Sequence, residues 1–337
     1  MRKILTCLFI FSLKFSLAQD PVFTQFFMIP ETMNSGFTGA YESTKAGVIH
    51  RVQWPGLDFS VNTQFAHIDN WFEEIKSGLG ISILNHKETQ TRYNFTQINM
   101  NYAYEVNLTD SWFFRPSISV GVGSKSFGFQ NILLEDQINI FSGIISTTSI
   151  DPSILEDNVR FFDYSASLLF MNERSWIGAT IRHLNKPNIS LIYNENAALD
   201  MFMSVHGYLE LPILRRNYEN RFFLTANGMK QGEYNRLDFG TQYVYDERFS
   251  FAVLAATNPI RVNPNSHFLT SINTVFGLAH EGWKFGYSYS FNTTNIGKTG
   301  GVYELSISYD FENNSNCFGC PKSVSYTHLT LPTIYSV

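Results

Sequence analysis

The sequence has few charged residues, few cysteines and no long hydrophobic run after its first residues. Charged residues make up 16% of the 337 residues, whereas a soluble domain usually carries about 25%. The three cysteines are too few for the disulfide framework of a small secreted domain. The nearest candidate for a membrane helix, 249–256, is far shorter than the roughly 20 apolar residues that a helical span needs. The composition therefore argues against both an ordinary soluble domain and a helical membrane protein.

The sequence also lacks recognisable motifs for a catalytic or metal site. The eight histidines are scattered, and no H-E-x-x-H pair occurs. No G-x-S-x-G motif marks a nucleophilic serine. The net charge of −5 is mild and gives no basic surface for nucleic acid. The sequence predicts no catalytic, cofactor-binding or metal-ligating residue, no cofactor and no nucleic-acid partner.

Two segments near the carboxyl end alternate between large apolar residues and small or polar ones. The apolar positions are Trp283, Phe285, Tyr287, Tyr289 and Phe291, then Tyr303, Leu305, Ile307, Tyr309 and Phe311. Since a strand turns successive side chains to opposite faces, each segment has one apolar and one polar face. The aromatic face suits lipid and the small polar face suits a wet lumen, which is the pattern of a membrane β-barrel.

Similar segments recur along the whole chain. The clear ones lie at 59–65, 78–83, 97–106, 117–123, 163–170 and 237–245, and less regular ones lie at 47–54, 176–184, 202–210, 221–228, 249–256 and 268–278. In the first of these, Phe59, Val61, Thr63 and Phe65 are predicted to share the lipid face. Because lipid tolerates no unpaired backbone, the strands must close on themselves. The predicted fold class is all-β: one transmembrane antiparallel β-barrel of about 14 strands in the outer membrane.

The two ends of the chain are expected to lie outside the barrel. A charged start and an apolar stretch lead to Ser16-Leu17-Ala18, a small-residue cleavage site, which is typical of a secretory signal peptide. The expected organisation is a signal peptide at 1–18, an amino-terminal segment and candidate plug at 19–45, the barrel at 46–311, a periplasmic segment at 312–322 and a tail at 323–337. The tail matches no strand, cap or motif, so we interpret it as foreign sequence, with a disordered tail as the alternative. Cys317 and Cys320 are candidates for one local disulfide bridge, or are two idle thiols.

Three stretches, 19–39, 125–158 and 186–199, do not fit the strand pattern. The second is a long insertion, and loops of this length are usually functional or disordered. Both later stretches follow odd-numbered strands, so they face the cell exterior if both chain ends are periplasmic. The middle of the long loop carries the apolar residues Ile138, Ile140, Phe141, Ile144 and Ile145. An apolar patch of this kind is typical of a partner-binding site or of a loop folded into its own barrel.

Three charged residues, Asp163, Arg160 and Arg182, fall on or near polar strand faces. They are candidates for ion pairs that cross the lumen, and a solvated interior explains them equally well.

Eight short stretches, taken together and in order, carry a family resemblance. They are Q-D-P-V-F-T-Q-F at 19–26, N-S-G-F-T-G at 34–39, R-V-Q-W at 51–54, F-F-D-Y-S-A at 161–166, H-L-N-K-P at 183–187, G-Y-S-Y-S at 286–290, E-L-S-I at 304–307 and C-P-K at 320–322. The chain from 19 to 322 thereby resembles the PorP/SprF family of type IX secretion outer-membrane proteins of the Bacteroidetes. It departs from the family pattern at Ser35-Gly36, where the family has Pro-Ala, and it lacks the glycine that usually ends the fourth stretch.

The resemblance implies a function that periodicity alone does not give. Family members work with the type IX translocon, and the barrel receives and anchors the C-terminal targeting domain of a cargo protein of the gliding-adhesin type. The expected partners are that domain, translocon components and outer-membrane lipid, and members are not known as enzymes. Family chains end close to the Cys-Pro pair, which supports a foreign origin for 323–337, and Cys317 is not part of the family ending.

Two other interpretations stay open at this point. One is a passive outer-membrane channel or hydrophobic-solute transporter, with 19–39 as its plug. The other is an outer-membrane hydrolase. If the family function holds, the apolar residues between Ile138 and Ile145 are the candidate contacts to the cargo domain.

Overall fold

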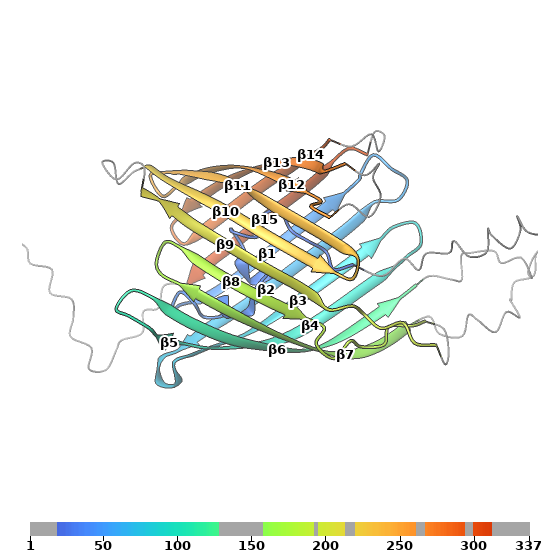
Figure 1. Ribbon diagram of the computed structural model, residues 1–337, viewed down its shortest axis with the longest axis horizontal. Helices are drawn as coiled ribbons and strands as arrows, with labels where there is room; N and C mark the ends of the chain where they lie inside the picture. Colours follow the sequence, from blue (N-terminus) through green and yellow to red (C-terminus); the bar gives the residue numbers. More distant parts are fainter. Residues whose placement is uncertain are drawn as a thin grey trace, which may run out of the picture.

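The chain folds into a closed antiparallel β-barrel (Figure 1). The computed structural model describes residues 19–127, 158–191, 195–212, 220–260, 267–293 and 299–311. Within these ranges neighbouring strands along the chain pair with each other, except that β4 (Asn94–Tyr104) and the short β5 (Val106–Asn107) both pair with β6 (Phe113–Ser126). β1 (Thr44–Gln53) pairs with β15 (Val302–Phe311), which closes the barrel. None of the helices in the described ranges has the length and hydropathy to cross a bilayer.

The described strands share the up-and-down order of the chain. They are β1 (Thr44–Gln53), β2 (Val61–Phe72), β3 (Ser77–Glu88), β4 (Asn94–Tyr104), β5 (Val106–Asn107), β6 (Phe113–Ser126), β7 (Asn158–Met171), β8 (Trp176–Arg182), β9 (Phe202–Leu211), β10 (Asn220–Gln231), β11 (Tyr234–Tyr245), β12 (Phe249–Thr257), β13 (Leu269–His280), β14 (Trp283–Asn292) and β15 (Val302–Phe311). Three short 3-10 helices are η1 (Pro30–Thr32), η2 (Ser35–Phe37) and η3 (Glu73–Ile75).

β5 continues β4 rather than adding a position to the wall. Ala103 pairs with Ser117 and Val106 pairs with Phe114, so both strands keep one register on β6. The interruption lies opposite Pro116, which has no N–H to donate to a ladder. The described wall therefore has fourteen strand positions, and the predicted barrel of about fourteen strands is confirmed.

The predicted lipid face is confirmed for the two carboxyl-terminal strands. Tyr287 is 43% exposed and Leu305 is 56% exposed, whereas their neighbours Ser288 and Glu304 point inward and are buried. The same alternation explains why apolar side chains cover the outside of the barrel, where lipid removes the cost of exposing them.

The predicted face of β2 is wrong. Thr63 and Phe65 point inward and are buried, while Gln64 is exposed. The ring of Phe65 lies 6.3 Å from the ring of Phe23, centroid to centroid. The lumen is not filled with water here, because a segment from the amino-terminal end occupies it. An inward aromatic residue on β2 therefore has an apolar surface to pack against.

The two rims of the barrel differ. At one rim the strands are joined by turns such as 73–76, 172–175, 246–248 and 281–282, and β1 begins and β15 ends there. We call this the short-turn rim. The other rim carries the connections 127–157, 183–201, 258–268 and 293–301. We call it the long-loop rim.

Candidate functional site

Residues 19–43, which we call the lumenal segment, lie inside the barrel (Figure 1, dark blue). They contain η1 and η2 and no strand, as the lack of alternation in 19–39 predicts. Phe26 and Phe37 are almost completely buried. They belong to one apolar cluster with inward side chains from opposite walls of the barrel, Leu169, Met171, Trp176, Ala252, Leu254 and Val275. The segment therefore fills the middle of the lumen.

The local sequence explains the turns of this segment. Pro30 occupies the first position of η1, where a missing N–H costs nothing. Asn34 precedes η2, and its side chain accepts a hydrogen bond from the N–H of Gly36 at 2.7 Å. The segment begins at the long-loop rim, where the N–H of Asp20 donates to Gln231. It ends at the short-turn rim, where the chain enters β1.

Glu304 of β15 holds the first turn of the segment. Its carboxylate accepts the main-chain N–H groups of Thr24 at 2.9 Å and Gln25 at 3.1 Å. Arg51 of β1 lies directly opposite Glu304 in the sheet and donates to the same carboxylate at 2.9 Å. The guanidinium of Arg51 also donates to the carbonyl of Val22. One buried ion pair thus binds the segment and joins the first and last strands.

A second contact lies at the long-loop end of the segment. The imidazole of His183, just beyond β8, bridges two carboxylates: Nε2 is 2.9 Å from Asp20 and Nδ1 is 2.9 Å from Asp163 of β7. Arg182 donates to Asp20 at 3.3 Å and to the carbonyl of Thr32 at 2.6 Å. Asp163 and Arg182 therefore both take part in ion pairs, but the pairs do not cross the lumen: Asp163 pairs with His183 on the adjacent part of the wall, and Arg182 pairs with Asp20 of the lumenal segment. Arg160 is exposed and takes no part in them.

The contacts between His183 and the two carboxylates shift the pKa values of His183 and Asp20. Burial opposes the charge on His183, but the Asp20 carboxylate and the hydrogen bonds to Asp163 and Asp20 raise the pKa of His183 to about 9. Burial also opposes the charge on Asp20, yet His183 and Arg182 hold the pKa of that carboxyl well below its usual range. An imidazolium between two carboxylates is the state that this geometry favours.

Raising the pH through about 9 should therefore loosen the long-loop end of the segment. The pKa of His183 rises from 6.5 to about 9 on folding, so its stabilisation is complete below pH 6.5 and is lost as the pH rises through 9. Single-channel recording at increasing pH should show more frequent opening above that value. The His183→Gln variant lacks the titrating group, so its opening should not change with pH across this window. If it keeps the wild-type pH profile, another group controls the opening.

A third contact lies near η1. Lys45 of β1 donates to Glu31 at 2.8 Å. The Nδ1 of His67 of β2 donates to the carboxylate of Asp69 at 2.9 Å, and its Nε2 lies 3.7 Å from Glu31. Asp69 also accepts the N–H of Gly39 at 2.8 Å. Burial raises the pKa of Glu31, but Lys45 and His67 outweigh it, so the pKa is lowered overall.

The side chains of Glu31, His67 and Asp69 are of metal-ligating types, with their ligand atoms within 4.8 Å of one another. Lys45 already neutralises Glu31, and both oxygens of Asp69 accept hydrogen bonds. A cation at this place would compete with the lysine ammonium group. We interpret the cluster as an ion-pair network that holds the segment to β1 and β2.

Arg115 of β6 holds the end of the segment. Its guanidinium is fully buried and donates to the carbonyls of Gly36 at 2.9 Å and Thr38 at 2.7 Å. Glu105 balances its charge. Gly78 of β3, two strand positions from β6, has no side chain, and an added Cβ there would lie 1.9 Å from the carbonyl oxygen of Thr38. The backbone of the segment therefore touches the backbone of β3.

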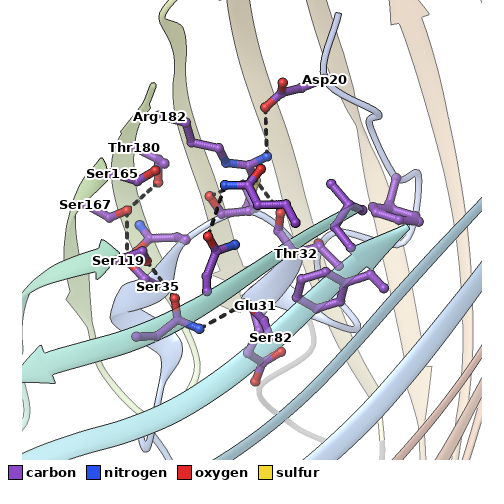
Figure 2. A pocket seen from close by; sticks show the side chains of 18 of the residues that line it. Asp20, Glu31, Thr32, Ser35, Ser82, Ser119, Ser165, Ser167, Thr180 and Arg182 are labelled. Carbon is purple, nitrogen blue, oxygen red and sulfur yellow. Dashed lines mark hydrogen bonds and ion pairs between the residues drawn. The ribbon is translucent and has the colours of Figure 1, made fainter. Parts of the chain in front are cut away.

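Small polar side chains line the rest of the interface (Figure 2). A cavity of about 60 Å³ separates the segment from the wall at β3, β4 and β6–β8. Beside this cavity the segment contacts the wall directly, with the Oγ of Ser35 at 2.9 Å from that of Ser117 and 3.2 Å from that of Ser167. This volume holds water molecules and no larger solute. A second cavity of about 460 Å³ lies at the long-loop rim, between residues 19–24 and the walls formed by β1, β2, β11, β13 and β14.

Seven of the eight stretches that carry the family resemblance meet at this interface. Asp20, Phe23 and Gln25 come from the first stretch, Asn34 and Gly36 from the second, Arg51 from the third, Asp163 from the fourth, His183 from the fifth, Ser288 from the sixth, and Glu304 and Ser306 from the seventh. Gln25, for example, donates to Ser288 at 3.2 Å and accepts from Ser306 at 2.6 Å. Residues that are up to 281 positions apart in sequence are in contact here.

Sequence reasoning missed several members of this interface. Glu31, Lys45, His67 and Arg115 were not singled out, although each is a charged or titratable residue in a chain with only 16% charged residues. Buried charges are rare unless they are paired, so a charge on an inward strand position was the available signal. The candidate partner residues Ile138, Ile140, Phe141, Ile144 and Ile145 lie outside the described residues, as do Cys317, Cys320, the signal peptide at 1–18 and the tail at 323–337.

Comparison with known proteins gives a family match and a fold match. A family model described as type IX secretion system membrane protein PorP/SprF matches residues 15–309. The structure of the P. putida toluene transporter TodX is 8% identical, with a TM-score of 0.50 over 83% of this chain and 93% of that one. The CymD monoaromatic hydrocarbon channel is 13% identical, with a TM-score of 0.49 over 86% of this chain and 93% of that one. At these identities the likeness concerns the barrel fold alone. The search of curated proteins found no match.

Proposed function

Because the chain belongs to the PorP/SprF family of type IX secretion system membrane proteins, we propose that it anchors a secreted protein at the cell surface. It is an outer-membrane β-barrel. In this proposal the barrel receives the C-terminal targeting domain of an adhesin-type or gliding-type cargo that arrives through the type IX translocon. The protein acts by binding, and we expect no catalytic activity.

The observation that carries this proposal is the filled lumen. The lumenal segment is held through Glu304 and Lys45 on the paired strands β15 and β1, and through Arg115 on β6 and His183 just beyond β8. Between the segment and the wall, the smaller cavity admits only water. We infer that the segment acts as a plug. A plugged barrel that belongs to a secretion family is better suited to hold a partner at its rim than to conduct it through its lumen.

The long-loop rim is the place we assign to the partner. Outer-membrane barrels have short periplasmic turns and longer external loops, so this rim faces the cell exterior. The cavity of about 460 Å³ opens there. β6 ends and β7 begins at this rim, so the connection that contains residues 138–145 starts and ends there.

Replacing residues 138–145 with a Gly/Ser linker should leave the barrel assembled and abolish co-purification of the cargo. The replacement removes the apolar side chains that a partner would cover. Assembly is checked by the heat-dependent mobility of the folded barrel on gels. The matched control is the same kind of linker at 261–266, in another loop of the same rim.

Two results would contradict parts of this proposal. Normal cargo recovery from the 138–145 variant would place the binding site elsewhere. Passage of small solutes through the wild-type protein in a liposome-swelling assay would favour the alternative function, a passive channel or hydrophobic-solute transporter.

A further inference from the structure

β7 has a free edge at the long-loop rim. The strand runs from Asn158 to Met171, but its ladder with β8 covers only Ala166–Met171. On its other side β7 pairs with β6 along its whole length, from Asn158 to Met171. The part of β7 from 158 to 165 therefore has a strand neighbour on one side only.

The chain that leaves β8 turns away from this edge. His183 adopts a positive φ of 59°, and its side chain enters the lumen. Farther on, Ile189 and Leu199 pack inside the rim against the inward rings of Phe95 and Phe161. The described parts of the connection between β8 and β9, 183–191 and 195–201, thus pack into the lumen mouth and do not extend the wall beside β7.

The side chain of Asn185 makes two of the main-chain hydrogen bonds that a neighbouring strand would otherwise make with β7. The Oδ1 atom of Asn185 accepts the N–H of Tyr164 at 3.2 Å, and its Nδ2 donates to the carbonyl of Phe162 at 2.8 Å. The N–H of Leu184 donates to the carbonyl of Tyr164 at 2.9 Å. These contacts show that the even-numbered residues of β7 turn their main-chain groups toward the free side.

The same alternation directs the main-chain groups of Asn158 and Arg160 to the free side. Within the described part of the chain, no residue pairs with them there. A strand edge of this kind is a template for another strand. The main-chain groups of Asn158 and Arg160 lie nearer the end of the barrel than Phe162 and Tyr164, whose side chains are 65% and 45% exposed on the outer face. Exposed aromatic residues mark the border of the lipid in such barrels, so the edge projects into water at the cell surface.

The chemistry of the edge defines what would add to it. The side chain of Arg160 is exposed and has no acidic partner among the described residues. Phe162 offers a large apolar surface next to it. An extended peptide with an acidic residue beside Arg160 and an apolar residue beside Phe162 would satisfy the main-chain groups and both side chains.

We propose that the edge of β7 at Asn158–Phe162 binds an extended segment of the cargo's C-terminal domain by strand addition. This inference rests on the proposed function, because the cargo domain is the partner. It adds the mode of binding: main-chain hydrogen bonds supply affinity, and Arg160 and Phe162 select the sequence.

Two substitutions at one position separate the main chain from the side chain. Arg160→Pro removes the free N–H and the charge, while the ladder with β6 uses the odd-numbered residues and keeps its donors. Arg160→Ala removes the charge alone. We expect Arg160→Pro to weaken binding of a purified C-terminal domain of a type IX cargo from the same organism about tenfold more than Arg160→Ala does. Binding is measured with the full-length barrel in nanodiscs. Asn158→Pro, at the start of the strand, should act in the same direction.

Amide hydrogen exchange of the wild-type protein completes the test. The amides of Asn158 and Arg160 should exchange rapidly in the free barrel and slowly once the cargo domain is bound. Slow exchange in the free barrel would mean that the protein's own chain covers the edge, and it would overturn the inference. Equal affinity of the two Arg160 variants would also overturn it, while leaving the proposed function intact. If the cargo domain does not bind the wild-type barrel at all, the proposed function fails as well.

Discussion

Replacing Glu304 with alanine should detach the lumenal segment and open the barrel. The carboxylate is 1% exposed, and it accepts hydrogen bonds from Thr24, Gln25 and Arg51. Its loss leaves a buried guanidinium without a counter-charge and two buried N–H groups without an acceptor. Removing one partner of a buried ion pair typically costs about 3–5 kcal/mol.

Planar-bilayer recording measures this effect. The wild-type protein should stay closed for most of the time, and Glu304→Ala should show long openings of large conductance. Glu74→Ala is the matched control, because Glu74 is exposed in the short turn after β2. Glu304→Gln keeps the volume and one acceptor, so it should lie between wild type and alanine. A closed Glu304→Ala barrel would mean that the other contacts suffice to hold the segment.

Substituting valine for Gly78 should displace the other end of the segment. A Cβ at this position would lie 1.9 Å from the carbonyl oxygen of Thr38, which is a backbone atom and cannot rotate away. Overpacking of this kind costs about 1–3 kcal/mol. Amide exchange of residues 36–39 should accelerate about ten- to a hundredfold.

The control for this substitution is Gly228→Val on β10. An added Cβ at Gly228 has its nearest neighbours at 3.8 Å, so the same change meets no backbone there. Exchange of residues 36–39 should remain at the wild-type rate in the control. Similar acceleration in both variants would show that valine disturbs the barrel in general. The contact between β3 and the segment would then not be what protects residues 36–39 from exchange.

The strands were predictable because their signal is local. Each strand meets lipid on one face, so alternation such as Tyr287 and Ser288 can be read within a few residues. The wrongly predicted face of β2 shows the limit of prediction from local alternation. Phe65 faces inward because its ring packs against that of Phe23, and the alternation within 59–65 does not reveal a partner that lies far away in the sequence.

The contacts of the lumenal segment were not predictable from periodicity. Thr24 and Glu304 are 280 positions apart, and they meet only after the barrel closes. The two prolines, two glycines and phenylalanines of 19–39 indicated a departure from the strand pattern and a candidate plug. The family resemblance selected many of the residues at the interface, but it gave no geometry for them.

The position of Arg51 and Glu304 has a consequence for assembly. Arg51 and Glu304 lie opposite each other on β1 and β15, so their ion pair forms at the seam between the first and the last strand to be synthesised. The same carboxylate receives Thr24 and Gln25 from the start of the chain. Until β15 is synthesised and inserted, neither the seam nor the segment has its acceptor. Closure of the barrel and fixation of the first turn of the lumenal segment are therefore a single late step, and a chain truncated before Glu304 lacks both.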